Sequence, residues 1–221
     1  MSSVCDLVIL GAGGMGQEVA DLVLAAAADG SGCRLVGFID DDTSLHGREV
    51  LGLPVLGDHH WLADRRFAVA LGVGAPAARR RAWMTLQAAG AVEAPALVHP
   101  TASVGLGVEL GTGTVVAAHS TLTADVVVGR FSIINVGATV SHNARLGDFA
   151  TVAPGAHLAG NVRVGEGADV GIGASVTQGN TIGDWAVVGA GTVVIEDVEA
   201  NTTVVGCPAR EVGRRPAGWH E

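Results

Sequence analysis

The sequence predicts a chain of two structural parts, an α/β domain over residues 1–98 and a parallel β-helix over residues 99–213, followed by a short tail over residues 214–221. Three observations lead to this fold class. An aliphatic residue recurs at every sixth position of the C-terminal half, and glycine recurs there at every eighteenth. In the N-terminal half, apolar strands alternate with helical segments, as they do in α/β domains.

The six-residue repeat is the strongest of these signals, because it runs without a miss. Amphipathic helices need a period of about 3.6, which this segment lacks, whereas a short strand and a corner fit into six residues. Each aliphatic side chain then points inward and stacks on its equivalent one coil away, where burial contributes about 1.5–3 kcal/mol per side chain. The repeating residues are Val104, Leu110, Val116, Leu122, Val128, Ile134, Val140, Leu146, Val152, Leu158, Val164, Val170, Val176, Ile182, Val188 and Val194.

Small residues and glycines mark the corners of this β-helix. Most residues two places before the repeating aliphatic residue are alanine or serine, which fit a tight corner. Coils stack at about 4.8 Å, three hexads make one coil of a triangular prism, and we expect the glycines to adopt backbone angles that other residues avoid. The glycines that follow the aliphatic residue at every eighteenth position are Gly111, Gly129, Gly147, Gly165 and Gly183.

The N-terminal half is predicted to be a small α/β domain from its apolar segments. Val19, Leu22 and Val23 share one face of the first helical segment, as expected for a helix packed on a sheet. The second strand ends in an acidic cluster at residues 40–42. The expected elements are strands over residues 7–10, 35–39 and 67–71, helices over 17–27 and 77–89, and a segment over 92–98 that leads into the prism.

A glycine turn follows the first strand and matches G-x-G-x-x-G at Gly11, Gly13 and Gly16. The acidic cluster lies near the spacing that is typical of dinucleotide sites, where backbone N–H groups and a helix N-terminus accept a pyrophosphate. The same glycines also suit a tight strand-to-helix turn that binds no ligand. The motif alone therefore leaves both interpretations open.

Composition and charge exclude several classes of protein. The net charge is −9 and no basic stripe is present, so nucleic acid is not an expected partner. No apolar run reaches the roughly 18 residues of a membrane span and no signal peptide is visible, so no membrane association is expected. Cys5, Cys33 and Cys207 lack metal-ligand spacing, and their sparse, odd number suits a reducing compartment. We therefore expect a cytoplasmic protein.

Three segments resemble one enzyme family. They are the junction Val-His-Pro-Thr-Ala at residues 98–102, the segment Asn-Val-Gly-Ala-Thr-Val-Ser-His-Asn at 135–143, and Gly-Cys-Pro-Ala-Arg at 206–210. With the hexad repeat and the N-terminal domain, they resemble the hexapeptide-repeat acyltransferases of the sialic acid O-acetyltransferase and nucleotide-amino-sugar N-acetyltransferase family. The resemblance implies a left-handed β-helix after a Rossmann-like domain, a homotrimer with active sites between neighbouring prisms, acetyl-CoA as co-substrate, no metal, and a nucleotide-sugar acceptor.

In that family the glycine turn and the acid after the second strand hold the nucleotide part of the acceptor. Relatives commonly have His in place of Met15, and a more polar loop in place of residues 72–75. Both differences remove hydrogen-bonding groups from the expected sugar pocket, so the acceptor is expected to differ from a standard UDP-amino-sugar. The positions that the resemblance assigns to this acceptor are Gly13, Gly14, Met15, Asp40, Asp41 and Gly72.

The expected general base is a histidine, because imidazole suits deprotonation of an amine or hydroxyl near neutral pH. Three of the eight histidines, His119, His142 and His157, lie on the prism, and none is at an inward position. The resemblance assigns catalysis to His142 and Asn143; the alternative is an exposed histidine without a function. Relatives have Glu or Asp in place of Asn143, and a neutral amide stabilises imidazolium less. Catalysis is then slower, or another carboxylate such as Asp148 assists.

In the family the coenzyme A arm runs along the later coils between two subunits. Relatives often have histidine in place of Thr151, and Arg210 either meets a CoA phosphate or is simply solvated. The positions that the resemblance assigns to acetyl-CoA are Asn135, Thr151, Gly160, Ile172, Ala190 and Arg210.

The predicted function is transfer of an acetyl group from acetyl-CoA to an amino or hydroxyl group of a nucleotide-linked sugar, and the same base serves either acceptor. One alternative is a non-catalytic nucleotide-binding scaffold that uses the glycine turn. Another is the prism-shaped carbonic anhydrase, which binds zinc with three histidines across a subunit interface. The three prism histidines are separated by 23 and 15 residues, so no two lie close in one loop as that family would need.

Overall fold

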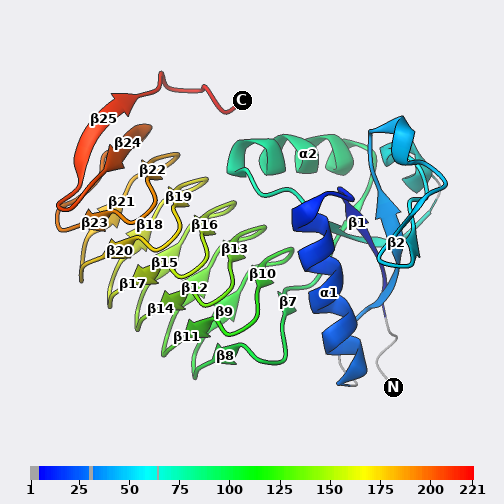
Figure 1. The fold of residues 1–221 in the computed structure, drawn as a ribbon, viewed down its shortest axis with the longest axis horizontal. Helices are drawn as coiled ribbons and strands as arrows, with labels where there is room; N and C mark the ends of the chain where they lie inside the picture. Colours follow the sequence, from blue (N-terminus) through cyan, green and yellow to red (C-terminus); the bar gives the residue numbers. More distant parts are fainter. Residues whose placement is uncertain (1–4, 30–31, 64) are drawn as a thin grey trace.

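The structure is a computed structural model that describes residues 5–29, 32–63 and 65–221. Figure 1 shows an α/β domain packed against the first coils of a long β-helix, with α2 lying along one side of the middle coils. The two-part fold class predicted from the sequence is confirmed.

The α/β domain is built on a four-stranded parallel sheet in the order β2-β1-β5-β6. The carboxyl ends of the three longer strands meet at one edge, where α/β domains bind their ligands. The predicted strands and helices are confirmed to within a few residues, whereas the hairpin and the two 3-10 turns were not foreseen. The elements are β1 (Asp6–Leu10), α1 (Gly14–Ala28), β2 (Arg34–Ile39), η1 (Thr43–Leu45), β3 (Glu49–Val50), β4 (Leu53–Pro54), η2 (His59–Leu62), β5 (Ala68–Leu71), α2 (Pro76–Ala88) and β6 (Val92–Glu93).

The β-helix is a triangular prism with three faces that meet at three edges. Each face is a sheet of strands that pair in parallel, except for the last strand of face I. Face I comprises β7 (Leu97–Val98), β10 (Val115–Val116), β13 (Ile133–Ile134), β16 (Thr151–Val152), β19 (Asp169–Val170), β22 (Val187–Val188), β24 (Thr202–Val205) and the antiparallel β25 (Arg210–Arg214). Face II comprises β8 (Ser103–Val104), β11 (Thr121–Leu122), β14 (Thr139–Val140), β17 (His157–Leu158), β20 (Ser175–Val176) and β23 (Val193–Val194). Face III comprises β9 (Glu109–Leu110), β12 (Val127–Val128), β15 (Arg145–Leu146), β18 (Arg163–Val164) and β21 (Thr181–Ile182).

We call the corner between faces I and II edge A, the corner between faces II and III edge B, and the corner between faces III and I edge C. Residues 135–138, 141–144 and 147–150 form these three corners in one coil. Because one coil takes eighteen residues, positions eighteen apart lie above one another on the same edge, as the pairing of Val140 with Leu158 shows on face II.

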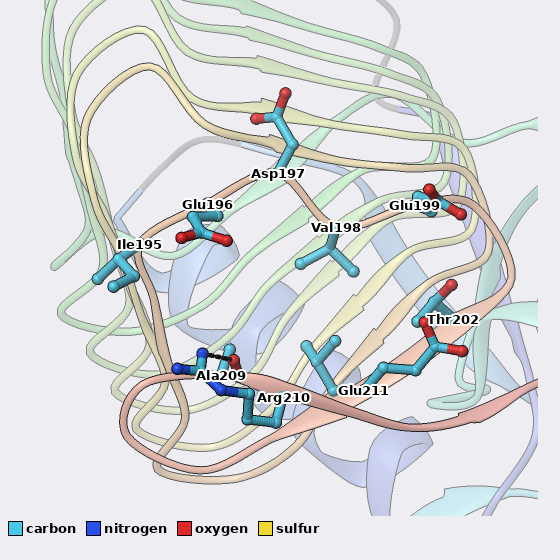
Figure 2. Close-up of a pocket in the computed structure, with 10 residues that line it drawn as sticks. Ile195, Glu196, Asp197, Val198, Glu199, Thr202, Ala209, Arg210 and Glu211 are labelled. Carbon is cyan, nitrogen blue, oxygen red and sulfur yellow. Dashed lines mark hydrogen bonds between the residues drawn. The ribbon is translucent and has the colours of Figure 1, made fainter.

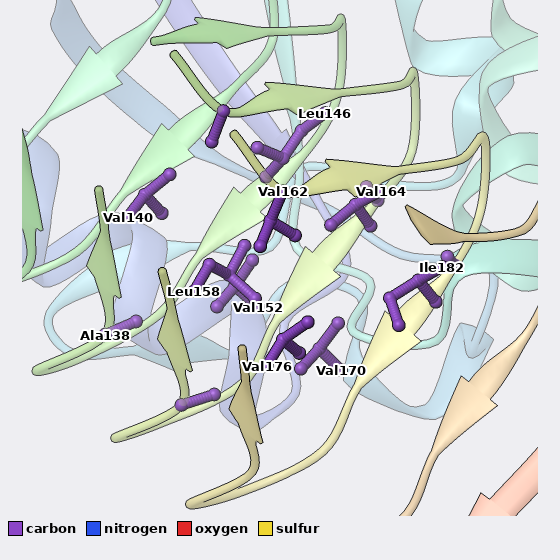
Figure 3. Close-up of a cluster of buried hydrophobic side chains, with 14 of the residues drawn as sticks. Ala138, Val140, Leu146, Val152, Leu158, Val162, Val164, Val170, Val176 and Ile182 are labelled. Carbon is purple, nitrogen blue, oxygen red and sulfur yellow. The ribbon is translucent and has the colours of Figure 1, made fainter. Parts of the chain in front are cut away.

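The repeating aliphatic residues fill the prism, and Figure 3 shows their side chains converging on its axis. From Val116 onward every one of them is buried. The first two depart from the prediction, because Val104 is 42% exposed and Leu110 is only partly buried. Both lie in the first coil, which has a neighbouring coil on one side only.

The corner glycines serve a different purpose from the one expected. Gly111 and Gly147 have ordinary backbone angles, but a Cβ on either would lie 2.6 Å from a backbone nitrogen of the next coil. Close stacking of coils therefore requires glycine at these positions. The left-handed backbone angles occur three residues after each aliphatic residue from Val104 to Val188. Many of these positions carry residues other than glycine, such as Phe131, Asn143 and Asn161 with φ of 53°, 59° and 61°.

Two of the three cysteines are paired. Cys5 and Cys33 form a disulfide because they precede two adjacent strands in register, β1 and β2. Cys207 is free and exposed. Among the described residues, no helix is long and apolar enough to cross a membrane.

The α/β domain and the tail both cover parts of the prism. Val115 and Ile133 point outward from face I, yet they are buried because they pack into the core of the α/β domain. The tail folds back onto edge C, where the His220 ring stacks on Trp185 with centroids 3.9 Å apart. Among the described residues, face II and edge B carry no such cover, and α1 borders edge A beside His99 and Val136.

Candidate active site

The three longer strands of the α/β domain end at a compact crossing of glycines. A Cβ on Gly72 would lie 2.5 Å from the Gly16 Cα, and a Cβ on Gly16 would collide with the Gly11 carbonyl. These three glycines therefore allow the strand ends and α1 to pack together. Gly13 and Gly14 are different, because they are exposed and a Cβ on either would meet nothing within 4 Å. Of the three predicted acceptor positions in this group, Gly13 and Gly14 face open space and Gly72 supports the turn.

The acidic residues after β2 shape this turn. The Asp40 carboxylate accepts hydrogen bonds from the Ala12 N–H at 2.8 Å and from the Asp42 N–H at 2.9 Å. Asp41 Oδ1 lies 2.9 Å from His59 Nδ1, and this hydrogen bond holds the pKa of the Asp41 carboxyl below its usual value. Asp41 is exposed, so its paired carboxylate still faces solvent.

Two histidines beside the acidic residues were not identified from the sequence. His46 Nε2 lies 2.7 Å from the Asp40 carbonyl, and His59 bonds Asp41. Both come from the segment that holds the unforeseen hairpin and 3-10 turns. Their sequence signal is weak, because a histidine in a loop is usually only solvated.

Met15 links the glycine turn to the prism. It lines a cavity of about 110 Å³ between α1 and edge A, together with Glu18, His99 and Val136. The lining is largely apolar on the prism side. Val136, which lines this cavity, follows Asn135 in the chain, and Asn135 is a predicted acetyl-CoA position.

His142 lies on edge B, two residues after the end of β14, and is exposed. Its ring covers Gly160 of the next coil, where a Cβ would lie 2.5 Å from His142 Nε2. Only glycine leaves room for the ring in this position. The structure thus brings together two residues that the sequence assigned to separate roles, the base and a coenzyme contact.

Asn143 holds the imidazole from the other side. It adopts a left-handed conformation that asparagine tolerates, and its Nδ2 lies 3.1 Å from His142 Nδ1. In this orientation the amide donates to Nδ1, and the ring proton is on Nε2. Rotation of the amide by half a turn lets Oδ1 accept from Nδ1–H, which frees the Nε2 lone pair to act as a base.

We expect Asn143→Asp to raise kcat by about tenfold, because a carboxylate accepts only from Nδ1–H and strengthens that bond as the ring becomes charged. Aspartate also tolerates the left-handed backbone of this position. Steady-state kinetics at saturating acetyl-CoA measures the effect, with the exposed Asn161→Asp as a control on the next coil. An unchanged or lower kcat would mean that the amide is not the limiting partner of His142.

The other predicted acetyl-CoA positions fall mainly on edge A. Asn135, Ile172 and Ala190 all lie there, and Ile172 is 61% exposed. Ile172 and Ala190 are eighteen residues apart and therefore stack in successive coils. Within one chain, edge A is separated from His142 on edge B by the width of face II.

Thr151 does not belong with these residues, which corrects its assignment to acetyl-CoA. It points outward from face I, is only 8% exposed, and its Oγ1 accepts a hydrogen bond from Arg79 Nη2 at 2.8 Å. The helix α2 covers its side chain through this contact. Sequence position alone could not reveal this contact between residues 72 positions apart.

Arg210 lies at the C-terminal end of the prism. It lines a cavity of about 380 Å³ together with Glu196, Glu199 and Glu211, and Figure 2 shows its side chain beside Ala209, whose carbonyl accepts from Nη1 at 2.7 Å. The surrounding carboxylates make this end of the prism acidic. Arg210 is exposed.

The other prism histidines stand apart from His142. His119 lies on edge A, and His157 lies on face II with its Nδ1 2.9 Å from Thr139 Oγ1. Within the described ranges no group of three or more His, Cys, Asp or Glu residues could hold a metal ion.

Comparisons with known proteins agree with this architecture. Residues 6–86 match the family model of the PglD N-terminal domain. A histidine-to-asparagine mutant of perosamine N-acetyltransferase from Caulobacter crescentus, in complex with CoA and GDP-perosamine, is 32% identical over 96% of this chain and 98% of that chain, with a TM-score of 0.85. The acetyltransferase domain of PglB from Neisseria gonorrhoeae FA1090 is 37% identical over 94% and 99%, with a TM-score of 0.84. WeeI from Acinetobacter baumannii AYE is 30% identical over 95% and 100%, with a TM-score of 0.84. The sequence finds no match among curated proteins.

A Rossmann-like domain followed by a left-handed β-helix, with a histidine exposed on a prism edge, defines a hexapeptide-repeat acyltransferase. The predicted handedness is confirmed, because a β-helix of the opposite hand would not superpose on these structures over almost the whole chain. At this identity and coverage, the chain belongs to the hexapeptide-repeat nucleotide-sugar acetyltransferases, which are acetyl-CoA-dependent enzymes. The predicted family, enzyme class and co-substrate are thereby confirmed.

Proposed function

We propose that this enzyme transfers an acetyl group from acetyl-CoA to the amino group of a nucleotide-linked sugar, with His142 as the general base. The observation that carries the proposal is the position of the imidazole, which is exposed, lies over Gly160 and is hydrogen-bonded to Asn143. Among the similar structures, the perosamine enzyme was studied with CoA and GDP-perosamine and with this class of residue mutated, to asparagine and to alanine. Those structures favour an amine as the acceptor over a hydroxyl.

The chemistry follows from this geometry. The amine nitrogen of the acceptor bonds to the carbonyl carbon of the thioester, and His142 Nε2 takes a proton from that amine. The carbon–sulfur bond then breaks, and the imidazolium returns the proton to the leaving CoA thiolate. Gly160 is the candidate donor for the developing oxyanion, because its N–H donates to no other group of the described chain and it lies directly beneath the ring.

The active site in this proposal lies between two chains of a homotrimer. His142 and Gly160 lie on edge B, whereas Asn135, Ile172 and Ala190 lie on edge A, across an uncovered face II. A cyclic trimer brings edge B of one chain against edge A of the next, so that all three sites are complete. Exposed apolar residues on edge A, Val136 and Ile172, support such a contact.

The acceptor is bound in this proposal by the α/β domain. Gly13 and Gly14 offer open backbone to a pyrophosphate at the start of α1, and Asp41 stands exposed beside them. The sugar then points along Met15 toward edge A. Because Met15 and the loop 72–75 lack polar side chains, we propose a sugar with fewer hydrogen-bonding groups than a standard UDP-amino-sugar at this end. The proposal also includes a cytoplasmic location for this enzyme.

The test is an acetyl-transfer assay with acetyl-CoA and a panel of GDP-, UDP- and dTDP-linked amino sugars, GDP-perosamine among them. Release of the CoA thiol together with an acetylated product supports the proposal. Calorimetry on the same panel identifies the alternative, because binding of a nucleotide sugar without turnover by any member of the panel would favour a non-catalytic scaffold.

A further inference from the structure

A single arginine is buried where the α/β domain meets the prism. Arg79 on α2 is 1% exposed, although it carries a charge and sits in an otherwise apolar interface. Burial lowers its pKa to about 10, and the nearby Asp169 carboxylate opposes this effect, so the guanidinium stays charged at neutral pH. A buried charge is expensive unless its donors are all used, so the contacts of this residue carry information about its purpose.

The guanidinium joins the loop after β5 to two coils of the prism. Nη1 donates to the carbonyls of Val73 at 3.0 Å and Gly74 at 2.5 Å. Nε donates to the Phe131 carbonyl at 2.8 Å, and Nη2 donates to the Phe149 carbonyl at 2.7 Å. Nη2 also donates to Thr151 Oγ1.

These two prism carbonyls are equivalent positions on edge C, one coil apart. They accept no other hydrogen bond within the described chain. The planar fork of an arginine spans two such acceptors at once, whereas the single ammonium of a lysine cannot. The fork therefore ties α2 to two adjacent coils at once.

The side chains of edge C distinguish these two coils from their neighbours. Phe131 and Phe149 stack with ring centroids 5.3 Å apart, and Trp83 of α2 packs on Phe131 at 4.5 Å. The equivalent positions before and after them are glycines, Gly113 and Gly167. A displacement of α2 by one coil would place Trp83 or the fork against a glycine corner instead of an aromatic one.

We propose that Arg79 is a positioning residue that fixes the axial register of the acceptor-binding domain on the prism. It ties the loop 72–74, which adjoins the glycine turn, to the coils that begin at Phe131 and Phe149, and His142 lies on the coil between those two corners. This inference rests on the proposed function, since register matters only if the α/β domain delivers the acceptor to the prism. Loss of register by one coil would shift the acceptor by about 5 Å.

The kinetic test compares two acceptors in the full-length protein, GDP-perosamine and the methyl glycoside of the same amino sugar, which lacks the nucleotide. Arg79→Met and Arg79→Lys are expected to lower kcat/KM for GDP-perosamine on the order of 100-fold, as misplacement by an ångström or more does. Turnover of the glycoside should stay within about twofold, because the prism alone presents it to the base. Arg81→Met, an exposed neighbour on the same helix, is the matched control. A merely structural role would lower both activities together.

A distance measurement tests the register without activity, so the inference can be judged even if GDP-perosamine is not a substrate. One spin label is placed on Cys207, which is free and exposed, and the other on a Met84→Cys substitution in α2, where Met84 is 52% exposed. Labelled chains are mixed with an excess of unlabelled chains, so that distances within one chain dominate. Pulsed dipolar spectroscopy should give one narrow distance for the parent and for Arg81→Met, and a broadened or shifted distance for Arg79→Met and Arg79→Lys. An unchanged distance in both Arg79 variants overturns the proposal.

Discussion

His142→Ala is expected to lower kcat by about 10²–10⁴-fold, the range that a general base contributes. The side chain is exposed on edge B and, within the described part of the chain, hydrogen-bonds only Asn143, so its removal costs no core packing. The melting temperature and the affinity for acetyl-CoA should therefore stay at parent values. Steady-state kinetics with thiol detection, thermal unfolding and calorimetry together measure these three quantities.

His157→Ala is the matched control for this experiment. His157 is also an exposed prism histidine, and it bonds Thr139 on face II rather than any residue of edge B. Its removal should leave kcat unchanged. If His142→Ala keeps more than half of the parent kcat, the assignment of the base is wrong.

Gly160→Ala is expected to lower kcat on the order of 100-fold without unfolding the protein. The added methyl would lie 2.5 Å from His142 Nε2, which is too close, so the imidazole must move away from its present position. Gly160 has no left-handed φ, so alanine introduces no backbone strain of its own. Kinetics and thermal unfolding separate the loss of turnover from any loss of stability.

The control for the added methyl is Gly213→Ala in β25, where a Cβ meets nothing within 4 Å and φ is again ordinary. That variant should match the parent in both rate and melting temperature. Full activity in Gly160→Ala would mean that the ring does not work from its position over Gly160.

The prism could be predicted from the sequence because its signal is local and repeated. A six-residue period leaves one inward side chain per strand, so the pattern of Val140, Leu146 and Val152 determines both the fold and the direction of each side chain. The eighteen-residue spacing also predicts stacking, as for His142 above Gly160. The role predicted for Gly147 was wrong. A glycine required by the close approach of a neighbouring coil looks the same in the sequence as a glycine required by unusual backbone angles.

The interface between the two domains could not be predicted in this way. Arg79 belongs to a run of three arginines on α2, and nothing in the sequence distinguishes it from Arg81, which is exposed. Its burial follows from contacts with Phe131 and Phe149, which lie more than 50 residues away in the chain. The same contact moved Thr151 from the expected coenzyme site into the domain interface. Long-range contacts of this kind depend on how two finished domains dock.

The central claim is that edge B of one chain and edge A of the next form each active site, and mixed trimers test it most directly. Two variants are each expected to be inactive as homotrimers, His142→Ala on edge B and Ile172→Asp on edge A, where a carboxylate repels the coenzyme. In any mixed cyclic trimer, one interface joins an intact edge B to an intact edge A. Random assembly from equal amounts should therefore restore about one quarter of the parent activity. A mixture that assembles into trimers but stays as inactive as its two components would contradict the claim.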